Sequence, residues 1–234
     1  MRVLVTRPRP EAEALAKELA ARGHATLIQP LLAIEPTGGP PPALEDVQAI
    51  LVTSANAAPA LATLATVPPV IVVGEASARA VRAAGVRRVE VAGGDAVGLA
   101  RHVTHHLRPG DGALLHLCGA DVRPGLAEPL MAAGFEVRRH VVYRARPVGE
   151  LAPATVAALR QRQIDAVLLF SPRTAATFSQ LVERHGLAHC LAATEALCLS
   201  DAIAAAARDL PWRNIRAAPR PETASLLRLL DGEG

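Results

Sequence analysis

Residues 36–42 read Pro-Thr-Gly-Gly-Pro-Pro-Pro, and this stretch decides how the chain is divided. Proline lacks a backbone N–H and glycine is unrestricted in φ, so such a run suits neither a helix nor an inner strand. Residues 146–153, Arg-Pro-Val-Gly-Glu-Leu-Ala-Pro, have a similar composition. We therefore expect two linkers, at 37–42 and 148–153.

The two linkers cut the chain into the segments 1–36, 43–147 and 154–234. The first segment is too short to bury a core of its own, so it must pack with another segment. The simplest arrangement is a discontinuous domain made of 1–36 and 154–234, with 43–147 inserted as a second domain. The two linkers would then run side by side as a hinge. A chain of 234 residues suits two domains of this size.

An internal repeat supports this division. When the sequence is shifted by 111 residues, 2–36 aligns with 113–147 without a gap. A second unit repeats as well, because 49–56 aligns with 166–173. Duplicated α/β halves commonly form two domains that face each other across a ligand-binding cleft. Given the linkers, each domain takes its first unit from one copy and its second unit from the other.

Strand and helix patterns alternate along the chain, which predicts parallel sheets covered by helices on both faces. The apolar run Val3–Thr6 predicts a buried strand, and a helix is predicted over Pro10–Arg22, ending at Gly23. We expect one strand over Ala25–Ile34 and another over Glu136–Tyr143. The predicted fold is α/β, with two similar flavodoxin-like parallel-sheet domains joined by a two-stranded hinge and one domain inserted in the other.

Composition argues against several classes of protein. No apolar run reaches the roughly 18 residues of a membrane span, so no membrane contact is expected. The N-terminus opens on a strand pattern rather than a signal peptide, which favours a cytoplasmic location. The net charge is only +3, basic residues are scattered and aromatic residues make up 2%, which argues against nucleic-acid binding.

Motifs for metals and for nucleophilic catalysis are missing from the sequence. The three cysteines form no CxxC pair, so they are interpreted as buried small residues. His102, His105 and His106 have no nearby Cys or carboxylate to complete a metal site, so a solvated helix end is favoured and no metal is expected. The chain has no P-loop, no G-x-G-x-x-G and no G-x-S-x-G motif, which argues against phosphoryl transfer, hydride transfer and nucleophilic hydrolysis.

Small polar loops follow most of the predicted strands. Ligands of open parallel sheets bind beyond the carboxyl ends of the strands, where helix N-termini offer free N–H groups to anions. Several such loops suit a small molecule with many carboxylates or phosphates. Serine, asparagine and aspartate are also ordinary N-caps, so capping alone is the competing interpretation. The candidate substrate-binding residues are Arg7, Ser54, Asn56, Gly74, Ser77, Ser171, Arg173 and Ser200.

Tyr143 is the only tyrosine, and it ends the strand before the second linker, which places it near the hinge. Its phenol can donate a proton to a leaving group, or it can pack with its hydroxyl satisfied, and position alone favours packing. Across the repeat Tyr143 aligns with Leu32, so one copy offers a phenol where the other has a plain core residue.

Six short motifs follow one another along the chain. They are Val3-Leu-Val-Thr-Arg-Pro8, Leu51-Val-Thr-Ser-Ala-Asn56, Val72-Val-Gly-Glu-Ala-Ser-Ala78, Gly94-Asp-Ala-Val-Gly-Leu99, Val141-Val-Tyr-Arg-Ala145 and Leu169-Phe-Ser-Pro-Arg173. In their order and spacing these motifs resemble the uroporphyrinogen-III synthases. One departure is at Leu199-Ser-Asp-Ala202, where many members have a Gly-Pro-Thr-Thr-like loop and only Ser200 or backbone N–H groups can replace a substrate-contacting threonine.

The resemblance implies a hydro-lyase of tetrapyrrole biosynthesis. Hydroxymethylbilane, a linear tetrapyrrole with eight carboxylates, would be cyclised to uroporphyrinogen III with loss of water and inversion of ring D through a spiro intermediate. The resemblance implies neither metal nor cofactor, and a monomer. It places the family's tyrosine, which assists departure of the hydroxyl, on Tyr143, and two substrate-contacting hydroxyls on Ser77 and Ser171.

Two other functions remain open on the residues. One is a non-catalytic two-domain protein that binds a polycarboxylate or a tetrapyrrole, which would use the same helix N-termini without the chemistry. The other is a regulator or flavodoxin-like signalling domain. The second is disfavoured, because no acidic phospho-acceptor cluster follows the predicted strands.

Overall fold

The computed structural model describes residues 1–122 and 124–232. Contacts along the chain divide it into two compact units. Unit 1 is formed by Met1–Ala33 with Arg146–Gly234, and unit 2 by Ile34–Ala145. None of the helices in the described residues is both long enough and apolar enough to span a membrane.

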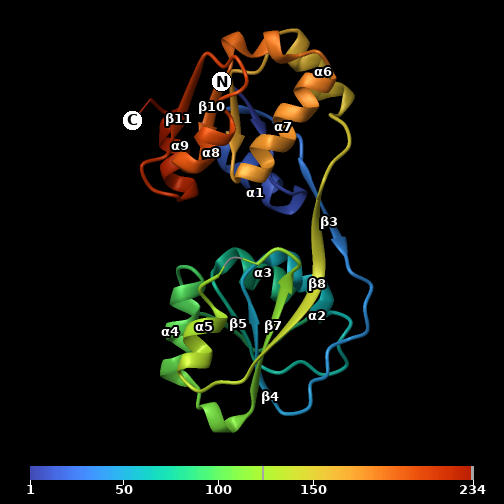
Figure 1. Ribbon diagram of the computed structural model, residues 1–234, viewed down its shortest axis with the longest axis vertical. Coiled ribbons are helices and arrows are strands. Elements are labelled where there is room, and N and C mark those ends of the chain that lie inside the picture. The colour runs from blue at the N-terminus through green and yellow to red at the C-terminus, as the bar shows by residue number, and fades with distance from the viewer. Residues whose placement is uncertain (123, 233–234) are drawn as a thin grey trace. The chain divides into compact units, whose positions relative to one another are not determined.

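The chain passes between the units inside two strands, β3 (Leu32–Pro36) and β8 (Val137–Pro147), as Figure 1 shows. The predicted linkers 37–42 and 148–153 therefore do not coincide with the crossings. The first linker belongs to unit 2, and the second belongs to unit 1. There Leu151 is buried, because the second segment packs against the unit 1 core instead of spanning a gap.

Unit 1 contains a five-stranded sheet in the order β11-β10-β9-β1-β2, and all four pairings are parallel. Read from its other edge and counted along unit 1, this is the flavodoxin order 2-1-3-4-5. The strands are β1 (Arg2–Val5), β2 (Ala25–Ile28), β9 (Ala166–Leu169), β10 (Glu195–Cys198) and β11 (Asn214–Ala217).

Helices cover both faces of the unit 1 sheet because its strands are apolar on both sides. Val3 and Val5 pack with α1 and α9, whereas Leu4, between them, faces α6, α7 and α8. Phe178 stacks on Trp212 at 5.5 Å between ring centroids in the second layer. The helices are α1 (Arg9–Ala21), α6 (Pro153–Arg160), α7 (Pro172–Arg184), α8 (Asp201–Ala206) and α9 (Thr223–Leu230).

Unit 2 contains a six-stranded sheet in the order β3-β8-β7-β4-β5-β6, and the pairings from β8 to β6 are parallel. If β7 and β8 are counted first, the five strands from β8 to β6 again follow 2-1-3-4-5. Each unit of the structure therefore combines the first repeat unit of one copy with the second repeat unit of the other. The predicted fold class is confirmed. The remaining strands are β4 (Val47–Val52), β5 (Val70–Val72), β6 (Val89–Val91) and β7 (Ala113–Gly119).

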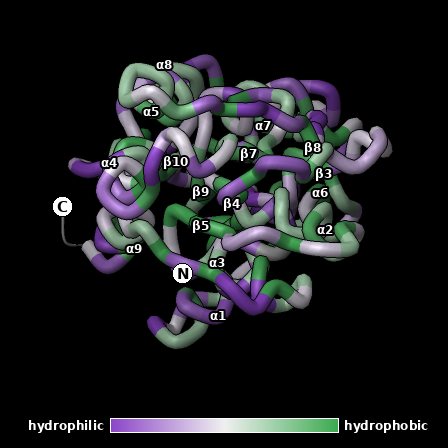
Figure 2. Tube along the Cα trace, turned by 90° about the horizontal axis from the view of Figure 1, so that it is seen from below, coloured by the Kyte–Doolittle hydropathy of each residue, from purple (hydrophilic) through white to green (hydrophobic). Residues whose placement is uncertain are grey.

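Two apolar layers enclose the unit 2 sheet as well. Leu115 and Leu117 face a layer with α2 and α3, whereas Leu114 faces α4 and α5. Inner strands of both sheets, such as β5 and β9, consist of hydrophobic residues (Figure 2). The helices are the 3-10 turns η1 (Ala55–Ala57) and η2 (Pro109–Asp111), and α2 (Ala58–Leu61), α3 (Glu75–Ala83), α4 (Ala96–His106) and α5 (Ala127–Ala132).

The strand predicted over Ala25–Ile34 is wrong, because β2 ends at Ile28 and β3 begins at Leu32 in the other sheet. Pro30 has no N–H to give to a ladder, so the backbone leaves the sheet there. The N–H groups on either side of it, from Gln29 and Leu31, still donate to Val5 O at 2.9 Å and Thr6 O at 3.2 Å. The equivalent strand of the second copy, β8, continues to Pro147 without a break, four residues beyond the predicted end.

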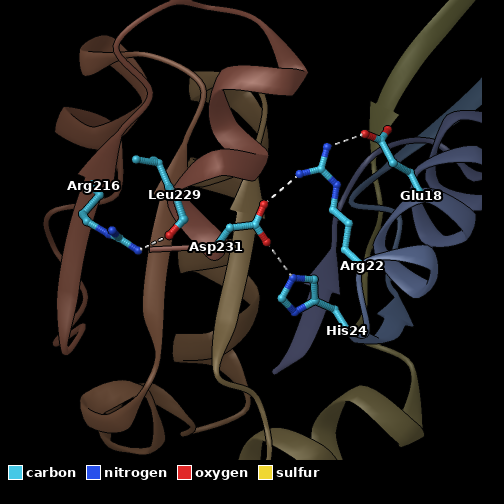
Figure 3. Close-up of polar contacts among 6 residues, drawn as sticks. All are labelled: Glu18, Arg22, His24, Arg216, Leu229 and Asp231. Carbon is cyan, nitrogen blue, oxygen red and sulfur yellow. Dashed lines mark hydrogen bonds and ion pairs between the residues drawn. The ribbon is translucent and has the colours of Figure 1, made fainter. Parts of the chain in front are cut away.

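A polar cluster fastens the C-terminal end of α9 to the end of α1 (Figure 3). Asp231 Oδ2 accepts a hydrogen bond from Arg22 Nη1 at 2.8 Å, and Asp231 Oδ1 lies 3.4 Å from His24 Nε2. Arg22 also pairs with Glu18 at 3.0 Å. Desolvation alone would raise the pKa of Asp231, but the hydrogen bonds from His24 and Arg22 and their charges outweigh it, so the pKa is lowered.

We predict that Asp231→Asn lowers the urea midpoint of unfolding at neutral pH, because Arg22 and His24 lose an ionised partner. A carboxylate whose pKa is lowered by folding stabilises the protein above its ordinary pKa, and this contribution is lost as the pH falls through the lowered value. The difference in urea midpoint between the variant and the wild type should therefore become smaller at acid pH. Asp209→Asn, at an exposed position of the same unit, is the control, and an equal effect there would contradict the assignment.

Candidate functional site

Each sheet has one switch point, where the direction of strand order reverses and ligands of this fold bind. In unit 1 it lies between β1 and β9, and in unit 2 between β7 and β4. Arg7 and Ser171 follow the first pair of strands, and Ser54 and Gly119 lie at the ends of the second.

Unit 2 contains a cavity of about 470 Å³ next to β8. Its walls come from the segment after β3, from the η1–α2 turn and from β8. The segment predicted as a free linker is therefore one wall of a cavity, and its prolines give that wall a rigid, apolar surface. The lining residues are Ile34, Pro36, Thr37, Gly38, Gly39, Pro40, Pro41, Pro42, Asn56, Pro59, Ala60, Thr63, His140, Val142 and Tyr143.

Tyr143 reaches this cavity because β8 carries a bulge. Val141 pairs with Cys118 and Tyr143 with Gly119, so Val142 has no partner of its own on β7. Successive residues of a regular strand alternate between faces, and one extra residue reverses that alternation for everything after it. Val142 and Tyr143 accordingly both pack against the α2–α3 layer and both line the cavity.

Backbone and side-chain hydrogen bonds fix the bulge. The N–H of Ala120 donates to Tyr143 O at 2.9 Å. The guanidinium of Arg139 donates to Ala120 O at 2.7 Å and to Gly119 O at 3.3 Å, which holds the carbonyls that follow β7. Sequence reasoning missed Arg139, because an arginine at a partly solvated strand position carries no distinguishing signal.

Of the candidate residues in unit 2, Asn56 and Tyr143 line the same cavity. Ser54 is the N-cap of η1, and its hydroxyl accepts a hydrogen bond from Asn56 N at 3.3 Å. Gly74 is the N-cap of α3 and offers only backbone there. Ser77 lies on the buried face of α3 and is only 6% exposed.

The candidates in unit 1 follow the adjacent strands β1, β9 and β10. Arg7 follows β1. Its guanidinium lies 4.8 Å from the centre of the Phe170 ring and donates to Glu11 Oε2 at 2.9 Å. The cation is thus held in place by an aromatic face and is partly neutralised by a carboxylate.

Ser171 caps α7, where its hydroxyl accepts from Thr174 N at 3.1 Å and lies 2.7 Å from Thr174 Oγ1. Ser200 is the N-cap residue of α8, and its side chain makes no capping hydrogen bond. Arg173 is an exposed residue in the first turn of α7. For Ser54 and Ser171 the capping interpretation therefore describes the hydroxyl in this conformation, whereas Ser200 is a half-exposed residue whose hydroxyl does not cap the helix.

His116 is a buried titratable residue that sequence reasoning missed, although a histidine between Leu115 and Leu117 in a strand pattern is a detectable signal. Its side chain lies in β7, and Nε2 is 3.3 Å from Thr53 Oγ1 at the end of β4. Burial, followed by the charge of Arg139, lowers its pKa to about 4. His116 is therefore neutral at physiological pH, and it is placed to orient Thr53 rather than to donate a proton.

We predict that His116→Gln removes part of the acid sensitivity of the fold. Between the ordinary pKa of 6.5 and the folded value of about 4, the unfolded chain binds a proton that the folded chain excludes, so stability falls as the pH drops through this window. The loss is on the order of 3 kcal/mol. The free energy of unfolding, measured with urea at several pH values in this range, should fall less steeply with decreasing pH in the variant than in the wild type. An equally steep fall would contradict the assignment. Exposed His105→Gln is the control.

The described residues contain no group of three or more His, Cys, Asp or Glu side chains that could hold a metal ion. The candidate residues of the two units supply a phenol, amide and hydroxyl groups, arginine and backbone N–H groups. Such a set can bind anionic groups and move a proton.

Two solved structures are similar to this chain to different degrees. A solved structure from Helicobacter pylori, described as uroporphyrinogen-III synthetase, superposes with a TM-score of 0.62 at 18% identity, covering 99% of each chain. A mutant uroporphyrinogen III synthase from Thermus thermophilus has a TM-score of 0.46 at 22% identity, with 100% of this chain and 98% of that chain covered. The search of curated protein sequences finds no significant match.

A protein-family model described as uroporphyrinogen-III synthase HemD matches residues 13–228 of the chain. The match includes the candidate residues of both units except Arg7, and it extends over nearly the whole sequence. The chain belongs to the uroporphyrinogen-III synthase HemD family.

Proposed function

We propose that this chain cyclises hydroxymethylbilane to uroporphyrinogen III, with loss of one water and inversion of ring D. The family is one of hydro-lyases in tetrapyrrole biosynthesis, and the family match over residues 13–228 supports the assignment. The structural observation that carries the proposal is the position of Tyr143. The only phenol of the chain is turned by a bulge into the wall of a cavity beside a switch point.

Tyr143 is proposed as the acid that assists departure of the terminal hydroxyl. As the C–O bond breaks, the phenol gives its proton to the leaving oxygen, water is released, and the bilane becomes an azafulvene cation. Attack by the substituted carbon of ring D forms the spiro intermediate, which fragments and recloses with ring D inverted. The proton lost when the last pyrrole regains aromaticity restores the phenol, so the enzyme is unchanged.

Steering is the other part of the proposed mechanism. The bilane closes without an enzyme to the isomer in which ring D is not inverted, so the protein must favour a different folding of the same substrate. Rigid apolar walls such as residues 36–42 suit the pyrrole rings, and Asn56 offers an amide to a propionate or acetate arm. Because free N–H groups at helix starts bind carboxylates, backbone at Gly74, Ser171 and Ser200 is proposed to hold further arms.

Arg7 is proposed to bind a substrate carboxylate from unit 1. The ring of Phe170 holds its guanidinium in place, which limits the rotamer entropy lost when a ligand binds. Glu11 competes for the same cation. Glu11 would keep the Arg7 side chain extended in the free protein. On binding, a substrate carboxylate would take the place of the Glu11 carboxylate beside Arg7.

We predict that Tyr143→Phe slows formation of the type III isomer by roughly a hundredfold, the contribution expected of a positioned acid. The assay supplies freshly prepared hydroxymethylbilane, oxidises the products and separates the type I and type III porphyrins. The melting temperature should change little, because only the hydroxyl is removed from a half-buried ring. Thr104→Val, which removes a hydroxyl from the exposed side of α4, is the control.

Two results would contradict this proposal in different ways. An unchanged rate in Tyr143→Phe would remove Tyr143 from the chemistry while leaving the activity in place. Only type I product from the wild-type protein, as in a blank, would reject the synthase activity. Tight binding of uroporphyrin without type III formation would instead support the non-catalytic binding protein.

We predict that Glu11→Gln lowers KM by roughly two- to fivefold, because it removes the carboxylate that competes with substrate for Arg7. The effect should shrink in high salt, which screens charges between partly exposed groups. Glu13→Gln is the matched control, since Glu13 pairs with Arg9 on the same helix at 3.4 Å. A KM that rises in Glu11→Gln would show that the pair is needed intact.

A further inference from the structure

Gly119 is the partner of Tyr143 across the β7–β8 ladder, and the tyrosine ring lies directly on it. A methyl group added at position 119 would be 2.7 Å from Tyr143 Cζ, 2.8 Å from Cε2 and 3.0 Å from the hydroxyl oxygen. Such distances are well below van der Waals contact between a methyl carbon and these atoms. The ring therefore occupies the space that any other side chain at 119 would fill.

The surroundings determine which group would yield if that space were filled. The backbone at 119 is held by ladder pairing, and its carbonyl accepts from Arg139 at 3.3 Å. The backbone of Tyr143 is held by the hydrogen bond from Ala120 N. The atoms that would be struck, by contrast, are at the far end of the tyrosine side chain. The phenol would be displaced, and with it the hydroxyl that the cavity presents.

Other close glycines differ in this respect. A methyl group at Gly98 would meet Gly93 O at 2.5 Å, and one at Gly112 would meet the carbonyl of Asp46. Both of these contacts are with backbone, so substitution there disturbs the fold rather than a site. Of the glycines in the described residues, Gly119 is the one whose missing side chain makes room for a candidate catalytic group.

We propose that Gly119 is a positioning residue, which sets where the Tyr143 hydroxyl lies by leaving a flat backbone surface for the ring. The inference rests on the proposed function for the role of Tyr143, but its structural part stands on the contact alone. The bulge selects the face of the sheet to which Tyr143 points, and the missing Cβ at 119 sets how deeply the ring settles onto that face.

The first test compares Gly119→Ala with Gly110→Ala, because the added methyl at 110 meets nothing within 4 Å. Displacing a reacting group by about 1 Å costs up to roughly a hundredfold in rate, so we expect kcat of Gly119→Ala to fall by between tenfold and a hundredfold, with KM nearly unchanged. Gly110→Ala should retain wild-type kinetics. Gly119→Ala with wild-type kcat would overturn the inference.

The second test places Gly119→Ala in a Tyr143→Phe background. If Gly119 acts through the hydroxyl, the further loss of kcat should be less than about twofold, because the group to be positioned is already absent. Equal losses in both backgrounds would overturn the inference, since Gly119 would then act by another route.

A third measurement is independent of activity. Tyr143 is the only tyrosine, so ring-labelled tyrosine gives a single NMR signal that reports its surroundings. This signal should move in Gly119→Ala and stay in place in Gly110→Ala, and an unmoved signal would overturn the inference. If the signal moves while Tyr143→Phe is fully active, the positioning of the ring is supported and the catalytic role of Tyr143 fails.

A stability cycle covers the case in which Gly119→Ala folds poorly. Tyr143→Leu introduces the side chain that the other copy of the repeat has at the equivalent position, Leu32. A shorter side chain relieves the overlap, so Gly119→Ala should lower the urea midpoint less in the Tyr143→Leu background than in the wild type. Equal decreases in both backgrounds would overturn the inference.

Discussion

The structure depends on the inability of its first repeat unit to bury its own apolar surface. β1, α1 and β2 are apolar on faces that they cannot cover by themselves, and β1 completes its ladder with β9, pairing Val3 with Ala166 and Leu4 with Val167. That long-range pairing joins the two chain segments of unit 1, which are separated in the sequence by unit 2. The second copy of the unit, β7, α5 and β8, must then find its partner in the inserted segment, which it does through β4. Burial thus requires each first unit to pair with a second unit, and in this fold the partner comes from the other copy.

Most of the fold follows from features visible in the sequence, because the strands are short apolar runs and several helices end at glycines such as Gly23, with φ of +80°. What the sequence did not reveal depends on tertiary context. Pro30 interrupts an apolar run that is otherwise strand-like, and residues 37–42 resemble any flexible linker until the cavity beside them is seen. The changes in composition predict domain boundaries at the linkers, whereas the chain crosses between the units within strands β3 and β8.

The sequence predicts the positions of the candidate residues at the ends of strands, but it predicts less well which of their side chains face a cavity or are available to a ligand. Position along a strand located Tyr143, but alternation counted from sequence cannot detect the extra residue at Val142 that turns the ring toward the cavity. Ser77 matched a family motif, yet it lies on the buried face of α3. The hydroxyls of Ser54 and Ser171 cap their own helices in this conformation, whereas that of Ser200 does not. Backbone N–H groups at helix starts remain as donors that suit carboxylates.

The two crossings of the chain have a consequence for how such a protein can change over time. Where unit 2 begins and ends, Thr37 donates from its N–H to Val142 O at 3.1 Å and from its hydroxyl to Val141 O at 2.9 Å. The points at which the chain enters and leaves unit 2 are therefore neighbours. If unit 2 were removed, a short peptide would suffice to rejoin the two segments of unit 1. Unit 2 is in this sense a self-contained insertion. It can be replaced, lengthened or transplanted as one piece, while the sheet of unit 1 keeps the pairing of β1 with β9.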